Sequence, residues 1–135
     1  MAEDEDLTGR WIGRYTYAAG GDPVPFEAEL WQTGTTLEGR VTEPNTFRRD
    51  AGPELSAMVL GWSSGGDLGF LKRYPGLPDE EQPVYEGRLL MGGKRAEGVW
   101  HLTGRPDWTG RFSMSRKPRA AAKADRRTAR EVERG

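Results

Sequence analysis

Lys72 is the polar residue of this 135-residue chain whose position bears most directly on chemistry. It alternates with Leu68, Phe70 and Tyr74, so a β-strand would direct its ammonium group to the same side as these large side chains. An unpaired ammonium group inside a protein is costly. Two interpretations stay open: Lys72 pairs with an anionic or carboxylate group of a ligand, or it lies near a rim and reaches water along its own stem.

The other residue types that do chemistry give no convergent pattern. Cysteine is absent, which excludes disulfides and thiolate chemistry. The single histidine, His101, has the parity opposite to Trp100, which predicts an outward direction and argues against haem ligation or a catalytic triad. The carboxylates at 79–81 are adjacent in a Pro-rich loop, and such neighbours rarely converge on one ion. We therefore expect no catalytic residues, no metal and no cofactor, with acid–base chemistry by Lys72 and a tyrosine as the enzyme alternative.

The elements that position these residues follow from a repeated glycine pattern. Gly13 is followed two positions later by Tyr15, and a glycine precedes a large apolar residue in the same way at 39–41, 87–89, 98–100 and 110–112. Residues two apart lie on the same face of a strand. A glycine on the inner face lets a strand bend sharply, and a neighbouring aromatic ring fills the space that its missing side chain leaves. The pattern is typical of a closed barrel.

Turn signals divide the chain into eight alternating stretches. They cover residues 9–18, 24–33, 35–43, 54–62, 67–74, 83–91, 95–103 and 108–116. An even number of strands can close an antiparallel barrel. The prediction is all-β: an eight-stranded antiparallel up-and-down β-barrel over 7–116. A disordered acidic N-terminus over 1–6 precedes it, and a short basic C-terminal tail over 117–135, disordered or partly helical, follows it.

Charge is distributed unevenly along the chain. Residues 1–115 hold 12 Lys and Arg against 18 Asp and Glu, whereas 116–135 hold eight against three. We expect no nucleic-acid partner beyond a weak contact through this basic tail. The acidic start is unlike a signal peptide, and no apolar run of about 18 residues is present. The expectation is a cytoplasmic protein without a membrane partner.

The connections between the stretches alternate in length. Those after the second, fourth and sixth stretches are short, whereas 19–23, 44–53 and 75–82 are longer. Alternate connections of an up-and-down barrel share one end, which predicts a tight base and a mouth that carries loops. We predict that the mouth holds a small apolar or aromatic ligand, although an eight-stranded barrel can also be filled by its own side chains. The predicted ligand-binding residues are Tyr15, Tyr17, Phe26, Lys72, Tyr74, Tyr85, Trp100 and Trp108.

The opposite end of the barrel, the base, has its own predicted contact. Trp11 begins the first stretch and Arg116 ends the last, and both share the inward parity. Closing the barrel pairs these two stretches, so we expect the Arg116 guanidinium over the Trp11 indole as a cation–π contact. The residues expected to plug the base are Trp11, Leu30, Leu37, Leu68, Leu89 and Met114.

The outer face of the predicted barrel indicates a second function. Trp31, Met58, Leu60, Trp62 and Leu71 have outward parity in the second, fourth and fifth stretches. An exposed apolar cluster usually marks a contact with another protein, and a homodimer is its simplest use. A protein-interaction or structural module therefore stays open beside the binding barrel.

Short motifs resemble two families of small barrels. Gly9-Arg10-Trp11 together with Arg116 resembles the opening Gly-x-Trp and the late Arg of lipocalin-type barrels, and 7–11 is similar to the start of the avidin family. The likeness to avidins continues through 84–87 and 99–103. These resemblances imply a calycin-like barrel.

The positions at which avidins contact biotin are mostly unmatched. Where avidins carry Asn two residues after the first Trp and Tyr on the third strand, this chain has Gly13 and Val41. Where they carry Asp on the last strand, it has Arg-Phe at 111–112. Of the biotin-contacting aromatic residues, only Trp100 corresponds. The resemblance therefore implies the barrel and argues against biotin as the ligand.

Overall fold

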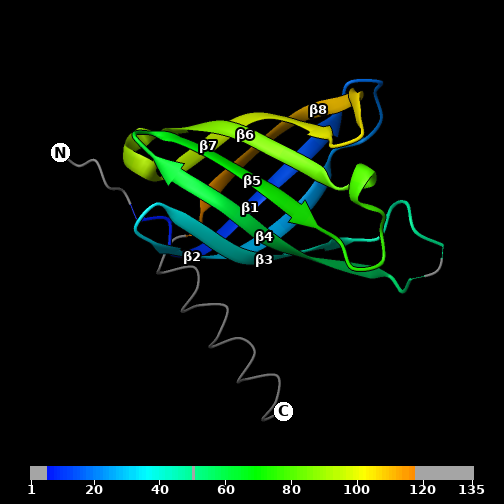
Figure 1. Cartoon of the computed structure of the whole chain (residues 1–135), viewed down its shortest axis with the longest axis horizontal. Coiled ribbons are helices and arrows are strands. Elements are labelled where there is room, and N and C mark those ends of the chain that lie inside the picture. Colours follow the sequence, from blue (N-terminus) through cyan, green and yellow to red (C-terminus); the bar gives the residue numbers. More distant parts are fainter. Residues whose placement is uncertain (1–5, 50, 118–135) are drawn as a thin grey trace, which may run out of the picture.

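The structure is a computed structural model that describes residues 6–49 and 51–117. The strands are β1 Gly9–Tyr17, β2 Val24–Thr33, β3 Thr36–Pro44, β4 Glu54–Ser64, β5 Asp67–Arg73, β6 Pro83–Leu90, β7 Arg95–Leu102 and β8 Arg105–Arg116. Two short 3₁₀ turns, η1 Asp79–Glu81 and η2 Met91–Gly93, complete the elements of the described residues. Each strand pairs antiparallel with the next and β8 pairs with β1, so the sheet closes (Figure 1). The predicted up-and-down barrel of eight antiparallel strands is confirmed.

The strand boundaries differ from the predicted ones chiefly in β8, which begins at Arg105 rather than at 108. The two residues 103–104 alone connect it to β7, and Leu102 pairs with Arg105. A register shift between His101 and Leu102 accompanies this tight connection. The turn-forming residue types at 106–107 predict a loop, but pairing with β7 overrides that local preference.

The predicted segments at the two ends of the chain are described only in part. Residues 1–5 of the acidic N-terminus and 118–135 of the basic tail lie outside the described residues. Lys117, the last residue described, donates its backbone N–H to the Arg10 carbonyl at 2.9 Å. No helix among the described residues is long and apolar enough to cross a membrane.

Glycines and aromatic rings are matched across the barrel wall. A Cβ on Gly13 would lie 2.6 Å from Phe26 Cζ. A Cβ on Gly110 would lie 2.7 Å from Trp100 Nε1 and 1.7 Å from the Thr16 carbonyl oxygen. No side chain tolerates such distances, so each ring occupies space that only glycine leaves. The predicted partnership of inner glycines with neighbouring aromatic rings is confirmed at these two positions.

The base of the barrel is filled by apolar side chains. The predicted residues Trp11, Leu30, Leu37, Leu68 and Met114 are buried, whereas Leu89 is half-buried. Leu7, which precedes β1, is completely buried and was not among the predicted residues. Its carbonyl accepts a hydrogen bond from Trp11 Nε1 at 2.9 Å. The segment before the first strand therefore helps to close the base.

Arg116 lies over Trp11, as the sequence predicts. The guanidinium carbon is 5.0 Å from the indole centroid, and the two residues are partners across β1 and β8. Arg116 Nη1 donates to the Thr8 carbonyl at 3.1 Å, and Nε donates to the Gly93 carbonyl at 3.2 Å. Nη2 donates to the Asp6 carbonyl. This cation therefore joins the first strand, the last strand and η2.

We expect Trp11→Ala to lower the free energy of unfolding by about 3–5 kcal/mol, because it removes a large side chain from the buried base. Arg116→Ala is expected to lower it by about 1–2 kcal/mol, the scale of a desolvated cation–π contact. Urea unfolding of both variants beside the wild-type chain measures these values. A larger loss for Arg116→Ala than for Trp11→Ala would contradict this ranking.

Candidate functional site

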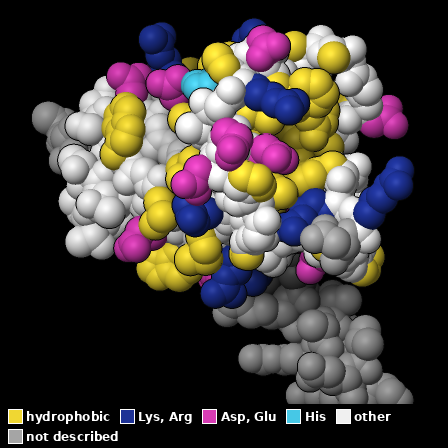
Figure 2. All heavy atoms as spheres, turned by 45° about the vertical axis from the view of Figure 1, so that its right-hand side comes forward, with side chains coloured by type: hydrophobic (Ala, Val, Ile, Leu, Met, Phe, Trp, Pro, Cys, Tyr) yellow, Lys and Arg dark blue, Asp and Glu magenta, His cyan; other side chains and the backbone are white. Residues whose placement is uncertain are grey.

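A cavity of about 320 Å³ lies at the end of the barrel that carries the longer loops. Figure 2 brings this end forward and shows hydrophobic side chains gathered between charged ones. Small-molecule cavities in proteins measure about 300–1,000 Å³, so this one suits a small ligand. The cavity, called the mouth cavity below, is lined by Tyr15, Tyr17, Phe47, Tyr74, Leu77, Glu81, Pro83, Tyr85, Trp100, Leu102, Arg105 and Trp108.

Edge-to-face aromatic contacts fix one part of the cavity wall. The centroid of the Tyr17 ring lies 5.3 Å from that of Trp100 and 6.1 Å from that of Trp108. Trp100 Nε1 donates to the Thr16 carbonyl at 3.0 Å, which holds the indole against β1. These rings are therefore positioned by contacts within the chain.

The loop between β3 and β4 supplies another part of the wall. Asn45 Oδ1 accepts the backbone N–H groups of Phe47 at 3.1 Å and Arg48 at 2.8 Å, which sets the course of the loop. The Phe47 ring then meets the Tyr74 ring edge-to-face at 5.5 Å. Arg48 Nη1 donates to the Pro75 carbonyl at 2.7 Å. The loop is thus tied to the connection between β5 and β6.

The structure brings six of the eight predicted ligand-binding residues to the mouth cavity: Tyr15, Tyr17, Tyr74, Tyr85, Trp100 and Trp108. Phe26 and Lys72 are buried and do not line it. The lining residues that the prediction omits are Phe47, Leu77, Glu81, Pro83, Leu102 and Arg105. Most of these lie in loops or at strand ends, where alternation gives no direction. Pro83 and Leu102 are exceptions, because their parity in β6 and β7 matches that of Tyr85 and Trp100.

Deeper in the barrel, Lys72 is paired with a carboxylate of this chain. Lys72 Nζ lies 2.6 Å from Glu43 Oε1, and the two side chains are exposed by only 2% and 0%. The expected path of Lys72 to water is wrong, because its side chain is buried, and Glu43 of this chain supplies an opposite charge. The prediction missed Glu43, although it shares the inward parity of Leu37 and Val41 on β3.

Three tyrosine hydroxyls surround this ion pair. Tyr15 Oη donates to Glu43 Oε2 at 2.6 Å, and Tyr74 Oη donates to Oε1 at 2.8 Å. Lys72 Nζ donates to Tyr85 Oη at 3.2 Å. The ammonium nitrogen also lies 4.5 Å from the Tyr15 ring centroid and 5.2 Å from those of Tyr74 and Tyr85, close enough for cation–π attraction. Because all three tyrosines also line the mouth cavity, they form a layer between it and the ion pair.

Burial and charge set the protonation of this tyrosine layer. Burial lowers the pKa of Lys72, and the Glu43 carboxylate opposes that shift. Burial, together with the nearby charge of Glu43, raises the pKa of Tyr15, Tyr74 and Tyr85 above that of free tyrosine. The three phenols therefore stay protonated and neutral at physiological pH.

The groups that face the mouth cavity offer apolar contact surface and hydrogen bonds. Its buried charges already neutralise each other, and what faces the cavity is largely aromatic surface with hydroxyl groups. Among residues 6–49 and 51–117, no cluster of three or more His, Cys, Asp or Glu side chains is arranged to hold a metal ion. Such a lining suits an apolar or aromatic molecule with few polar groups.

Comparison with protein-family models and with curated proteins gave no match for this chain. The closed barrel of eight antiparallel strands is consistent with a calycin-like architecture. One fold supports many functions, so function has to be inferred from the cavity and the surfaces of the barrel.

We expect the loss of one member of the ion pair to be more harmful than the loss of both. Glu43→Gln or Lys72→Met alone leaves a buried polar group without its partner and should lower the free energy of unfolding by about 3–5 kcal/mol. The double variant keeps an amide oxygen as acceptor for the tyrosines and should lose less than either single variant. Urea unfolding of all four proteins gives the coupling energy. Additive losses would contradict the coupling.

Proposed function

We propose that this chain is a non-catalytic binding barrel that holds a small apolar or aromatic molecule in the mouth cavity. The observation that carries the proposal is a cavity of about 320 Å³ whose wall includes the rings of Tyr17, Phe47, Trp100 and Trp108. Aromatic side chains offer a large apolar contact area and pack well against planar molecules.

The order of the cavity wall supports this function. Trp100 is fixed by its hydrogen bond to Thr16, and Phe47 is held by the Asn45 loop contacts and by Tyr74. A wall that is ordered without a ligand has less side-chain entropy to lose when one binds. The same hydrogen bonds and ring contacts hold the Trp100 and Phe47 rings in the wall of the cavity.

The family resemblances agree with a ligand at the open end. Gly9-Arg10-Trp11 with Arg116 is similar to lipocalin-type barrels, and Trp100 corresponds to a ligand-contacting residue of avidins. Biotin is not the proposed ligand, because Gly13 and Val41 replace polar residues of the avidin site. We place the ligand above the tyrosine layer, which closes the way to the centre of the barrel.

Trp108→Ala is expected to weaken the binding of a neutral naphthalene fluorophore roughly tenfold, because it removes one aromatic contact from the rim. Trp31→Ala is the matched control: Trp31 lies on the outer face and is 47% exposed, against 49% for Trp108. Fluorescence titration of both variants measures the two affinities. Equal effects of the two substitutions would contradict a ligand in the mouth cavity.

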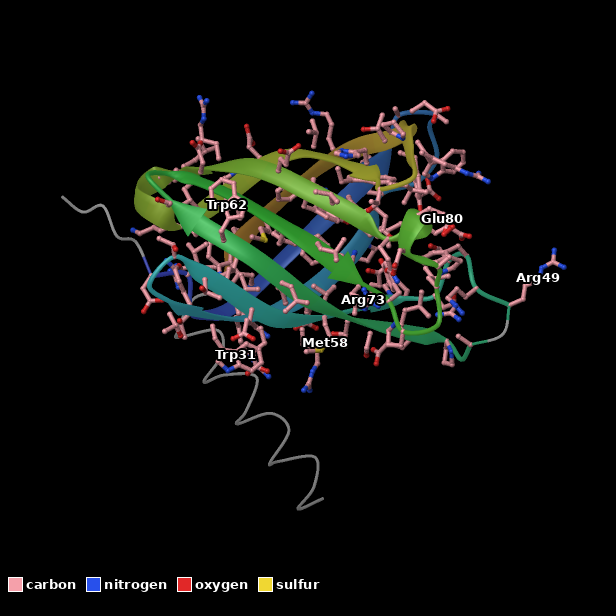
Figure 3. The ribbon with its side chains drawn as sticks, viewed as in Figure 1. Trp31, Arg49, Met58, Trp62, Arg73 and Glu80 are labelled. Carbon is pink, nitrogen blue, oxygen red and sulfur yellow. The ribbon has the colours of Figure 1, made fainter. Side chains whose placement is uncertain are left out.

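A second candidate function is self-association through the outer face of β2 to β5. Trp31, Met58, Leu60 and Trp62 are 46–47% exposed there, and Leu71 is half-buried (Figure 3). Figure 3 shows Trp31, Met58 and Trp62 on the outside of the barrel, away from the loops at the mouth. Several large apolar side chains exposed in one area are typical of a contact with another protein.

The charges on this outer face favour a second copy of the chain as the partner. Glu38 and Arg40 alternate on β3 and are paired in register with Leu60 and Met58 of β4. A two-fold axis that crosses the strands between Met58 and Leu60 would place Glu38 of each copy opposite Arg40 of the other copy. The dimer would therefore contain two equivalent Glu38–Arg40 contacts. A partner surface that carried charges of only one sign would instead place a like charge opposite either Glu38 or Arg40.

We expect Glu38→Arg to weaken this dimer at least roughly tenfold, because it places two arginines over each other. The exchange Glu38→Arg with Arg40→Glu should restore the dimer, since the pair is reciprocal. Glu97→Arg on β7 is the control, because it makes the same charge change away from this face. Sedimentation equilibrium measures the dissociation constants. A wild-type chain that stays monomeric at high concentration would contradict the proposal.

A further inference from the structure

The hydroxyls of the tyrosine layer differ in what they can still donate. Tyr15 and Tyr74 both donate their O–H group in a hydrogen bond to Glu43, so their oxygen atoms can only accept further hydrogen bonds. Tyr85 Oη accepts a hydrogen bond from Lys72 Nζ, and its own O–H donates to no acceptor among the described residues. A buried donor without an acceptor is costly. The Tyr85 hydroxyl therefore has one hydrogen bond still to donate.

The position of Tyr85 is fixed by its neighbours. Its ring is stacked on Phe70, with centroids 4.9 Å apart and planes at 7°, and it lies 6.4 Å from the Trp100 ring. Tyr85 lines the mouth cavity although its side chain is almost completely buried. Burial raises the pKa of this phenol well above its usual value, so the proton stays in place through the physiological range.

The charges around the cavity favour neither an anion nor a cation. Glu43 and Lys72 neutralise each other beneath the tyrosine layer. Glu81 and Arg105, which both line the cavity, carry opposite charges. A carboxylate or ammonium group placed against the layer would lose its hydration, and the two charges beneath the layer already neutralise each other. The ligand group at this depth should therefore be uncharged.

The size of the cavity limits the ligand. A dry cavity of about 150 Å³ is enough to hold one benzene molecule. At about 320 Å³ the mouth cavity offers roughly twice that space. Its aromatic walls add a preference for planar groups, since rings pack against rings in stacked or edge-to-face arrangements.

We infer that the mouth cavity binds an uncharged planar molecule of about one or two rings, whose carbonyl or hydroxyl oxygen accepts a hydrogen bond from Tyr85 Oη. The inference rests on the proposed binding function. It adds to that function the charge of the ligand, its shape and one polar contact.

Four naphthalene probes test the inference on the full chain. Acetylnaphthalene carries a carbonyl, and isopropenylnaphthalene has the same shape without the acceptor. Naphthoate and naphthylmethylammonium add a negative and a positive charge. By isothermal titration, the acetyl probe is expected to bind about three- to tenfold more tightly than the isopropenyl probe, the scale of one hydrogen bond. Both charged probes are expected to bind more weakly than the acetyl probe.

The variant Tyr85→Phe tests whether the Tyr85 hydroxyl causes the preference for the acetyl probe over the isopropenyl probe. This variant should bind both neutral probes equally. Trp31→Ala is the control, because Trp31 lies on the outer face and does not line the mouth cavity. It should preserve the preference for the acetyl probe. Should Tyr85→Phe fold poorly, the comparison of the two neutral probes on the wild-type chain still decides the inference.

The outcomes separate the inference from the function on which it rests. Equal binding of the two neutral probes by the wild-type chain, or tighter binding of a charged probe, would overturn the inference while leaving a binding cavity in place. An unchanged preference in Tyr85→Phe would overturn the role of Tyr85. No binding of any of the four probes would overturn both the inference and the binding function.

Discussion

The buried contact between Glu43 and Lys72 divides the interior of the barrel into two parts with different chemistry. An ion pair removed from water is stable only when its remaining hydrogen-bonding capacity is also satisfied. Tyr15, Tyr74 and Tyr85 satisfy it, and the same three residues line the mouth cavity. The depth and polarity of that cavity therefore depend on the ion pair. On the other side of the pair the base is apolar and closed.

The curvature of the wall brings these groups together. Phe26 fills the space over Gly13 and lies 5.5 Å from the Lys72 ammonium, so the missing side chain of Gly13 admits one ring of the cage around the charge. Trp100 fills the space over Gly110 and reaches the Thr16 carbonyl, which ties β7 to β1 beyond β8. Glycines in the barrel wall thus decide where the neighbouring aromatic rings lie.

Alternation in the sequence is enough to predict the strand number, the closure of the barrel and the contact of Arg116 with Trp11, because the period of two fixes the face of every residue in a strand. Glu43 also obeys that alternation. The sequence does not single it out, because a buried carboxylate without a partner is costly and no partner is evident on the neighbouring strands. Its partner Lys72 lies on β5, which does not neighbour β3. Each residue looks anomalous alone, and only the closed barrel brings them together. Phe47 has no such signal, since its place depends on the Asn45 loop geometry.

The cage around Lys72 also bears on why the proposed ligand is placed at the mouth. Aromatic rings around an ammonium group, completed by a carboxylate, form the kind of site by which proteins bind cationic ligands. In this barrel a side chain of the protein occupies that site, with Glu43 at 2.6 Å and three phenols around it. The deep site is therefore closed to ligands, and its charge is cancelled. The tyrosine hydroxyls between the ion pair and the cavity are neutral and held in fixed positions. They can select a ligand by hydrogen bonding without attracting it by charge.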